Sequence, residues 1–399
     1  MTDRSDRQYP REPDRRRRDR PPPGAGSRGD ILQRGLRMLG GGDRQAALRL
    51  WLHALDSPIE TAQRPWILKA VADVYLDLGD HEKALQACSE AVRAAPDLAE
   101  AWVSLGRIRE LARDREAAAA CYGRAAELEP GLLVAWNNLG VVFQSMDRHT
   151  DALECFVRAS EIAPGSSSVW FNCGNACVGI EDYTAAVGHY KRALEFSPED
   201  PRIWYNLGFA HSRLGQRREA IDAYGESLSH TPTDPAPWYN IANVFLDSHR
   251  HAEAIACYQQ ALRMNPDDFD SWNNLGTCWI LVKDLTEAIH CYSMAVTVRP
   301  TAATCWNNLG NAWSRLGDQE RAVACLQEAI RIQEKEASFH FNRAVAFARV
   351  DSIEDVLREL GRALELNPLL GDLLPEIEPL QPLLGDPRLR RLIHSTPLA

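Results

Sequence analysis

The stretch Ala135–Gly140, with the sequence AWNNLG, returns almost unchanged twice later in the chain. The second copy is SWNNLG at 271–276 and the third is CWNNLG at 305–310. Tryptophan recurs every 34 residues through all three copies. A fixed period of this length predicts a solenoid of stacked repeats rather than several separate globular domains. The members of the tryptophan series are Trp102, Trp136, Trp170, Trp204, Trp238, Trp272 and Trp306.

The unit 133–166 shows what each period encodes. Its apolar residues from Trp136 to Phe143 fall on one face of an α-helix, and a second helical stripe contains Phe156. Pro164 ends the second helix because proline cannot continue it. One helical hairpin cannot bury both of its apolar faces, so each unit must stack on the next. The sequence therefore predicts an all-α fold.

The pattern divides the chain into three parts. Residues 1–30 hold few apolar side chains and are expected to be disordered, and 31–370 are predicted to form the solenoid. Residues 371–399 are rich in Leu and Pro. We interpret them as a helical cap on the apolar face of the last repeat, the alternative being a docking segment for a partner. The ten predicted units lie near 28–61, 65–98, 99–132, 133–166, 167–200, 201–234, 235–268, 269–302, 303–336 and 337–370.

Charge separates the first part from the rest. The formal net charge is -10, and nine Arg against six acidic residues give 1–30 a charge of +3, which leaves -13 on the remainder (-10 minus +3). An acidic solenoid argues against a nucleic-acid role for the repeats. The run Arg15-Arg16-Arg17-Arg18 leaves two interpretations open, a solvated linker or an arm for nucleic acid or an anionic membrane.

Targeting and catalytic signals are missing from the sequence. No run approaches the roughly 18 apolar residues of a membrane helix, and we see no secretory signal, so we expect a cytoplasmic location. We find no phosphate loop, nucleophile elbow or zinc motif, which predicts a non-enzymatic protein without cofactor or metal. His249 and His251 are expected in an exposed turn rather than in a metal site. The ten cysteines include no Cys-x-x-Cys pair and are interpreted as small buried residues in a reducing compartment.

A 34-residue unit with Trp, Leu-Gly, an aromatic, Ala, a second aromatic, Ala and Pro resembles the tetratricopeptide repeat. The resemblance covers about 28–370 and is most specific over 99–336. It implies a right-handed superhelix with a concave groove lined by the first helices, and it implies binding of other proteins through extended or helical segments rather than an activity. Repeats that clamp the carboxylate tails of heat-shock chaperones place Lys just after the Trp position. This chain has none there, so that partner is not expected.

A row of asparagines lies two residues after each Trp from Trp136 onward and continues after His340, which replaces Trp in the last unit. Asn is a mediocre helix former, so its repetition needs a reason. The row, called the ladder below, resembles the asparagine ladder of O-linked N-acetylglucosamine transferase, which implies a grip on the backbone of an extended peptide. The alternative is that each Asn bonds the backbone of the neighbouring repeat. The ladder is Asn138, Asn172, Asn206, Asn240, Asn274, Asn308 and Asn342.

Two further groups are predicted to flank the ladder. Asn175, Asn243 and Asn311 follow their Trp by five residues and should lie beside it. Four aromatic residues are predicted either to form an anchoring patch in the groove or to pack between first helices. They are Phe171, Tyr205, Phe209 and Tyr239.

The sequence thus predicts a protein-interaction scaffold that holds an extended segment of a partner, with no small-molecule ligand. Two alternatives stay open. One is a regulatory or targeting subunit of a multiprotein enzyme or assembly complex. The other is an adaptor that reaches nucleic acid or an anionic membrane through the Arg-rich tail.

Overall fold

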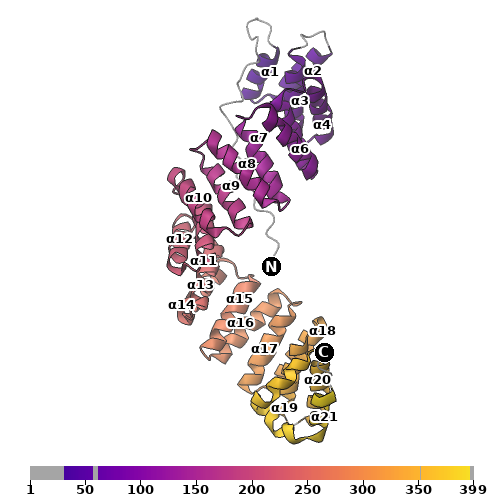
Figure 1. Cartoon of the computed structure of the whole chain (residues 1–399), viewed down its shortest axis with the longest axis vertical. Coiled ribbons are helices and arrows are strands. Elements are labelled where there is room, and N and C mark those ends of the chain that lie inside the picture. The colour runs from indigo at the N-terminus through magenta and orange to yellow at the C-terminus, as the bar shows by residue number, and fades with distance from the viewer. Residues whose placement is uncertain (1–30, 57–61, 351, 396–399) are drawn as a thin grey trace. The chain divides into compact units, whose positions relative to one another are not determined.

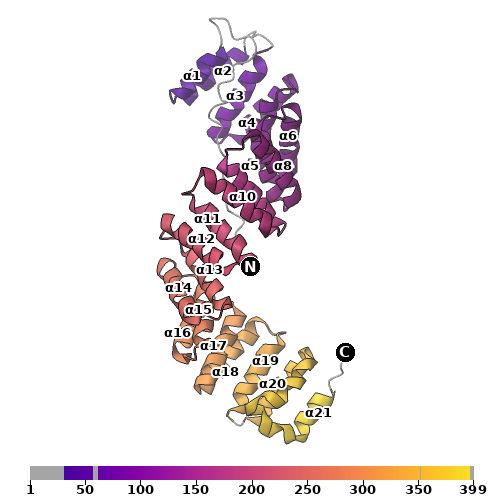
Figure 2. The same cartoon turned by 60° about the vertical axis from the view of Figure 1, so that its left-hand side comes forward.

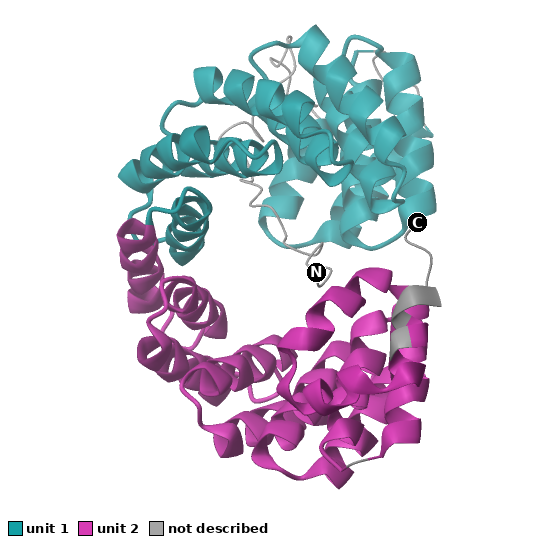
Figure 3. Cartoon of the chain, turned by 60° about the horizontal axis from the view of Figure 1, so that its bottom comes forward, with its two compact units in different colours: residues 1–216 teal, residues 217–399 magenta. Residues whose placement is uncertain are grey.

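The computed structural model describes residues 31–56, 62–350 and 352–395, and every regular element in them is a helix. The chain divides into two compact units, unit 1 (1–216) and unit 2 (217–399), coloured separately in Figure 3. We describe each unit by itself. The predicted Arg-rich tail, including Arg15–Arg18, lies outside the described residues.

In unit 1, each odd-numbered helix from α1 to α9 packs against the helix that follows, and each hairpin packs against the next helix along the chain. Figures 1 and 2 show these consecutive hairpins. The helices are α1 (Ile31–Gly40), α2 (Arg44–Leu55), α3 (Arg64–Asp77), α4 (His81–Ala94), α5 (Ala99–Leu111), α6 (Arg115–Leu128), α7 (Leu133–Ser145), α8 (His149–Ile162), α9 (Ser167–Gly179), α10 (Tyr183–Phe196) and α11 (Pro201–Arg213).

Unit 2 continues the same alternation and ends in shorter helices. Its first helix, α12, and the last helix of unit 1, α11, both fall in the predicted repeat 201–234. The helices are α12 (Arg217–His230), α13 (Pro235–Asp247), α14 (His251–Met264), α15 (Phe269–Leu281), α16 (Leu285–Val298), α17 (Ala303–Leu316), α18 (Gln319–Ile332), α19 (Ala337–Ala348), α20 (Ile353–Leu366), η1 (Pro368–Glu376), η2 (Glu378–Gly385) and α21 (Pro387–Ser395).

Glycine and a large side chain meet where the two helices of a repeat cross. A Cβ added at Gly140 would lie 2.6 Å from the ring of Phe156, and one at Gly174 would lie 2.4 Å from the ring of Tyr190. Both rings are fully buried. A methyl group at the glycine would therefore force the two helices apart, which explains why this position is small in every repeat of the regular series.

The Trp series joins each repeat to the one before it. The indole N–H of Trp136 donates to the carbonyl of Pro130 at 3.0 Å, and that of Trp272 donates to the carbonyl of Pro266 at 2.8 Å. The same bond links Trp102, Trp170, Trp204 and Trp306 to the Pro six residues earlier. In the last repeat, His340 Nε2 lies 3.0 Å from the carbonyl oxygen of Glu334. Trp and Pro recur together because they make one contact at the turn between repeats.

The turn inside each hairpin has a residue with positive φ at one fixed position of the 34-residue period. Glycine takes this position at Gly79, Gly215 and Gly317, with φ between 72° and 101°. Five other repeats place a side-chain-bearing residue there with φ between 58° and 67°, although this region favours glycine. These residues are Arg113, Asp147, Glu181, His249 and Lys283.

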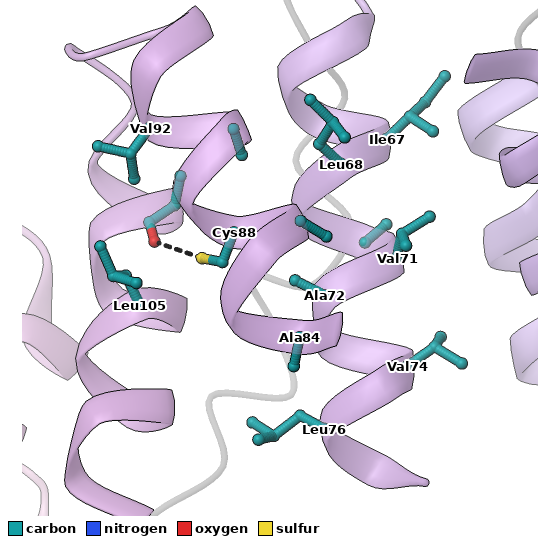
Figure 4. Packing of buried hydrophobic residues seen from close by; sticks show 14 of the residues in the cluster. Ile67, Leu68, Val71, Ala72, Val74, Leu76, Ala84, Cys88, Val92 and Leu105 are labelled. Carbon is teal, nitrogen blue, oxygen red and sulfur yellow. Dashed lines mark hydrogen bonds between the residues drawn. The ribbon is translucent and has the colours of Figure 1, made fainter. Parts of the chain in front are cut away.

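All ten cysteines are free thiols, nine of them buried and Cys325 half-buried. Figure 4 shows Cys88 on α4 beside Val92 and Leu105, with its Sγ 3.3 Å from the carbonyl oxygen of Ala101. Burial raises the pKa of Cys121 to about 11 and that of Cys173 to about 12. The thiols therefore stay protonated and pack as small apolar groups.

The leucine-rich segment after Pro368 packs on the last hairpin. Leu374, Leu380 and Leu389 are fully buried in a cluster with residues of α19 and α20, including Phe341 and Leu360. The segment thus covers the apolar side of the last hairpin, as a cap does. No helix in the described part of the chain is both long enough and apolar enough to cross a membrane.

Candidate functional site

The ladder lies along the first helices of the repeats. Its residues belong to α7, α9 and α11 in unit 1 and to α13, α15, α17 and α19 in unit 2. First helices of successive repeats pack directly on each other at α5–α7, α7–α9 and α17–α19. A residue two positions after Trp therefore lies close to the preceding repeat in this layer.

Four ladder residues donate their side-chain amide to the preceding repeat. Asn172 Nδ2 donates to Asn137 Oδ1 at 3.0 Å. In unit 2, Asn308 donates to Asn273 Oδ1 at 3.4 Å, Asn342 donates to Asn307 Oδ1 at 2.8 Å and Asn274 donates to Tyr239 Oη at 3.3 Å. Each of these acceptors is the residue directly after the Trp of the preceding repeat, and Asn274 Nδ2 also donates to Asn243 Oδ1 at 3.5 Å. These inter-repeat bonds thus end on a side chain, and not on the backbone as the alternative interpretation of the ladder expected.

The two ladder residues nearest the start of the row are closed to solvent. Asn138 is 7% exposed and Asn172 is 0% exposed. The residue that would accept from Asn138 is Val103, which has no polar group. The oxygens Asn172 Oδ1 and Gln144 Oε1 are buried without a hydrogen-bond partner among the described residues. A peptide on the surface of unit 1 could not reach these amides without moving the helices.

The ladder of unit 2 is more open. Asn240, Asn274, Asn308 and Asn342 are all half-buried. Asn274 also accepts from Asn273 Nδ2 at 3.3 Å. For Asn308 and Asn342, the bond to the preceding repeat is the one side-chain hydrogen bond that each makes with described residues. Each of these two amides therefore keeps one N–H and its carbonyl oxygen for other partners.

The second asparagine row is explained by the tyrosine of the second helix. Tyr190 Oη donates to Asn175 Oδ1 at 2.8 Å, and Tyr258 Oη donates to Asn243 Oδ1. These two asparagines therefore satisfy a buried hydroxyl. The third member differs because Leu326 takes the tyrosine position in its repeat. The half-buried amide of Asn311 forms no hydrogen bond with any described residue.

The four predicted aromatic residues divide between the units, with Phe171, Tyr205 and Phe209 in unit 1 and Tyr239 in unit 2. Phe171 is buried, and its ring centroid lies 5.9 Å from that of Tyr190. Tyr205, Phe209 and Tyr239 are half-buried. Within unit 1, Phe171 serves as packing between helices, and the remaining aromatic groups stay partly accessible.

Sequence reasoning missed one lysine in the position that follows Trp. Lys69 follows Leu68, which replaces Trp in the unit 65–98. Its Nζ lies 2.8 Å from Asp73 Oδ2, and Ser104 Oγ donates to Asp73 Oδ1 at 2.9 Å. Burial disfavours both charges, yet their attraction raises the pKa of Lys69 and lowers the pKa of Asp73. Lys69 is thus held in an internal ion pair, and the repeat register was the signal that could have found it.

Metal ligands do not gather in the described residues: no group of three or more His, Cys, Asp or Glu side chains could hold an ion there. The pKa of Tyr239 is raised by burial, even though Asn243 and Asn274 contact its hydroxyl. The chemistry available on this face is therefore hydrogen bonding by neutral amides and hydroxyls, beside a few charged groups.

Sequence comparisons agree with this architecture. Residues 98–270 match the family model described as the Cilia and flagella-associated protein 70 C-terminal domain. Three models described as tetratricopeptide repeat match residues 65–108, 239–304 and 303–336. No curated protein matches the sequence.

Solved structures with a similar fold share little sequence identity. One is the C-terminal part of a TPR repeat-containing protein from Cytophaga hutchinsonii, with 14% identity and a TM-score of 0.53 over 58% of this chain and 95% of that chain. MamA from Desulfovibrio magneticus RS-1 is 20% identical over 42% of this chain and 94% of its own, with a TM-score of 0.40. YrrB, titled a TPR protein with an unusual peptide-binding site, is 22% identical over 46% of this chain and 94% of its own, and its TM-score is also 0.40.

Proposed function

Because this chain is a tetratricopeptide repeat protein, and such proteins bind other proteins, we propose that it is a non-enzymatic scaffold for an extended partner segment. The segment would lie on the first helices of unit 2, across α17 and α19. The proposal rests on the side-chain amides of Asn308 and Asn342, which use only part of their hydrogen-bonding capacity within the protein. Each amide is anchored by one bond to the preceding repeat and still has a donor and an acceptor left.

This arrangement suits a peptide backbone for a physical reason. Every peptide unit offers one N–H and one C=O, and the remaining groups of a ladder amide are one C=O and one N–H. The inter-repeat bond holds the amide in place before the ligand arrives, which reduces the side-chain entropy lost on binding. Recognition of backbone rather than side chains would tolerate many partner sequences.

The proposal gives the two halves of the ladder different roles. Asn138 and Asn172 are buried, so we assign them to the packing of unit 1. Asn206 and Asn240 have interaction partners of their own, and neither is needed for the proposed site. Asn311, which lies three residues after Asn308 on α17, adds a third neutral amide to the site.

A peptide selected from a random library on the wild-type chain provides the test. The double variant Asn308→Ala/Asn342→Ala should weaken its binding about tenfold or more, because each lost hydrogen bond is worth about 1 kcal/mol. Fluorescence anisotropy measures the affinity, and circular dichroism measures the helix content, which should not change. Asn138→Ala is the matched control and should leave the affinity unchanged. If the double variant binds the peptide as tightly as the parent, these amides are structural only.

The two alternatives from the sequence remain proposals of lower rank. A subunit of a larger assembly would co-purify with a catalytic or structural protein at fixed stoichiometry. An adaptor working through Arg15–Arg18 would lose its retention on heparin when 1–30 are deleted. No contact among the described residues favours either alternative over peptide binding.

A further inference from the structure

The position nine residues after Trp carries arginine on two neighbouring first helices of unit 2. On α17, Asn308, Asn311 and Arg315 follow the spacing i, i+3, i+7 and therefore share one face of the helix. On the next first helix, Asn342 and Arg349 have the same spacing of seven, Arg349 being the C-cap residue of α19. The two helices pack together and are joined by the bond from Asn342 to Asn307. The two guanidinium groups thus extend the surface that holds the open ladder amides.

Neither arginine is neutralised within the structure. Arg315 and Arg349 are both exposed, and no carboxylate of the described chain lies within ion-pair distance of either. Two arginines on the second helices of the same unit are paired with carboxylates, whereas Arg263 on α14 donates to Gln260 Oε1 and forms no ion pair with a described residue. Arg331 lies 2.8 Å from Glu328, and Arg362 lies 3.1 Å from Glu365. The guanidinium groups of Arg315 and Arg349 are therefore available to a carboxylate from a partner.

Charge changes sign along the same layer of unit 2. On α13 the position equivalent to Arg315 holds the exposed residue Asp247. On α15 it holds Leu281. Asp270, at the start of α15, adds a second carboxylate at the α13–α15 end. The first helices thus carry negative charge at α13 and α15 and positive charge at α17 and α19. A segment lying along the layer would meet a different charge at each end.

We propose that Arg315 and Arg349, with the free amide of Asn311 one turn before Arg315 on α17, form a carboxylate-binding subsite. It would take Asp or Glu side chains of the partner segment where that segment crosses α17 and α19. This inference rests on the proposed function, since it adds side-chain selection to a site that otherwise reads only backbone. Guanidinium groups suit the role because they bind carboxylates through two parallel N–H donors and keep their charge at all physiological pH values.

The expected change in peptide affinity sets the precision that the experiment needs. A single exposed ion pair changes affinity only a few-fold, because water and salt screen it. Two adjacent guanidinium groups with a neutral donor should together change affinity about tenfold at low ionic strength. The effect should shrink as salt is added, whereas hydrogen bonding by the ladder should not.

Three fluorescent dodecapeptides of matched length test the subsite on the full chain. They repeat Gly-Ser-Glu, Gly-Ser-Gln or Gly-Ser-Lys, and their affinities are measured by anisotropy at low and at moderate salt. The acidic peptide should bind about tenfold more tightly than the neutral one. Arg315→Gln/Arg349→Gln should abolish that preference without changing the melting temperature, because exposed side chains contribute little to stability.

Two controls separate this inference from the proposed function. Arg263→Gln/Arg331→Gln removes the same charge from the second helices α14 and α18 and should keep the acidic preference. Asn308→Ala/Asn342→Ala should weaken all three peptides alike. If the arginine variant keeps the full preference, or the control loses it equally, the subsite is wrong while the ladder can still stand. If the neutral peptide fails to bind the wild-type chain, the ladder proposal fails instead.

Discussion

Two side chains of the Trp-Asn-Asn-Leu-Gly phrase hold neighbouring repeats together in different ways. The indole of Trp136 reaches back six residues to Pro130 along the same chain segment. The amide two positions after Trp reaches a side chain 35 residues earlier, as in Asn342 to Asn307. The period of 34 residues located the Trp series, but the hydrogen bond of each indole depends on how the chain turns after Pro. The partner of the amide likewise appears only once the repeats are stacked.

The buried thiols lead to a pH prediction at the scale of single residues. Burial raises the pKa of Cys155 to about 12 and that of Cys278 to about 11, whereas an unfolded thiol has about 8.5. A raised pKa stabilises the folded chain while the thiol is protonated, and this contribution is lost as the pH rises through the folded value. We expect the free energy of unfolding to fall between about pH 8.5 and 12. Urea denaturation at a series of pH values measures it.

A thiol count on the native chain is the companion measurement. At pH 8 an aromatic disulfide reagent should react slowly with the thiols of the native protein. After denaturation it should react with all ten cysteines. The half-buried Cys325 should react first. Fast reaction of several thiols in the native state would contradict the burial that the structure shows.

At the scale of elements, the backbone conformation of the turn within each hairpin is the feature that the sequence predicts least well. In the repeat 133–166, α7 ends at Ser145 and α8 begins at His149. The backbone angle at Asp147, with φ of 58°, could not be predicted because most repeats place an ordinary side chain at this position. What enforces the angle is the packing of two helices on each other across a very short connection.

Glycine at these turns should therefore stabilise the protein. A side-chain-bearing residue with positive φ costs about 1 kcal/mol, although glycine returns part of this gain through the entropy of the unfolded chain. Glu181→Gly and Lys283→Gly should each raise the free energy of unfolding by about 0.5 kcal/mol. The reverse change, Gly317→Ala, should lower it by about 1 kcal/mol. Thermal denaturation measures these changes. If Glu181→Gly and Lys283→Gly both destabilise the protein, the explanation by positive φ is wrong.

At the scale of the whole molecule, the main helix contacts that the structure describes within each unit join neighbouring repeats. Clusters of buried residues follow the chain, and the last cluster includes the cap residues Leu374 and Leu380. In such an array the stability of each part depends on local interfaces, so a perturbation at one end should remain there. The division into units 1–216 and 217–399 is a further consequence of having no single central core.

Mutation of the cap tests this locality. Leu374→Ala and Leu380→Ala remove fully buried side chains and should each destabilise their surroundings by about 2–5 kcal/mol. Hydrogen exchange should accelerate in α19–α21 and stay unchanged in α3–α6. Leu369→Ala, at a residue that is 65% exposed, should have little effect anywhere. A uniform loss of protection along the chain would show that the array unfolds as one unit.

The sequence alone determined the helical class, the length of the repeat and the small, aromatic and proline positions, because these follow from local periodicity and chain chemistry. It also located the ladder. Only the tertiary structure decided which ladder amides are accessible. Asn172 is closed and Asn308 is half-open, although both follow Trp by two residues. The exposure of an amide depends on contacts between residues 30 or more positions apart, and such contacts exist only after the repeats have stacked.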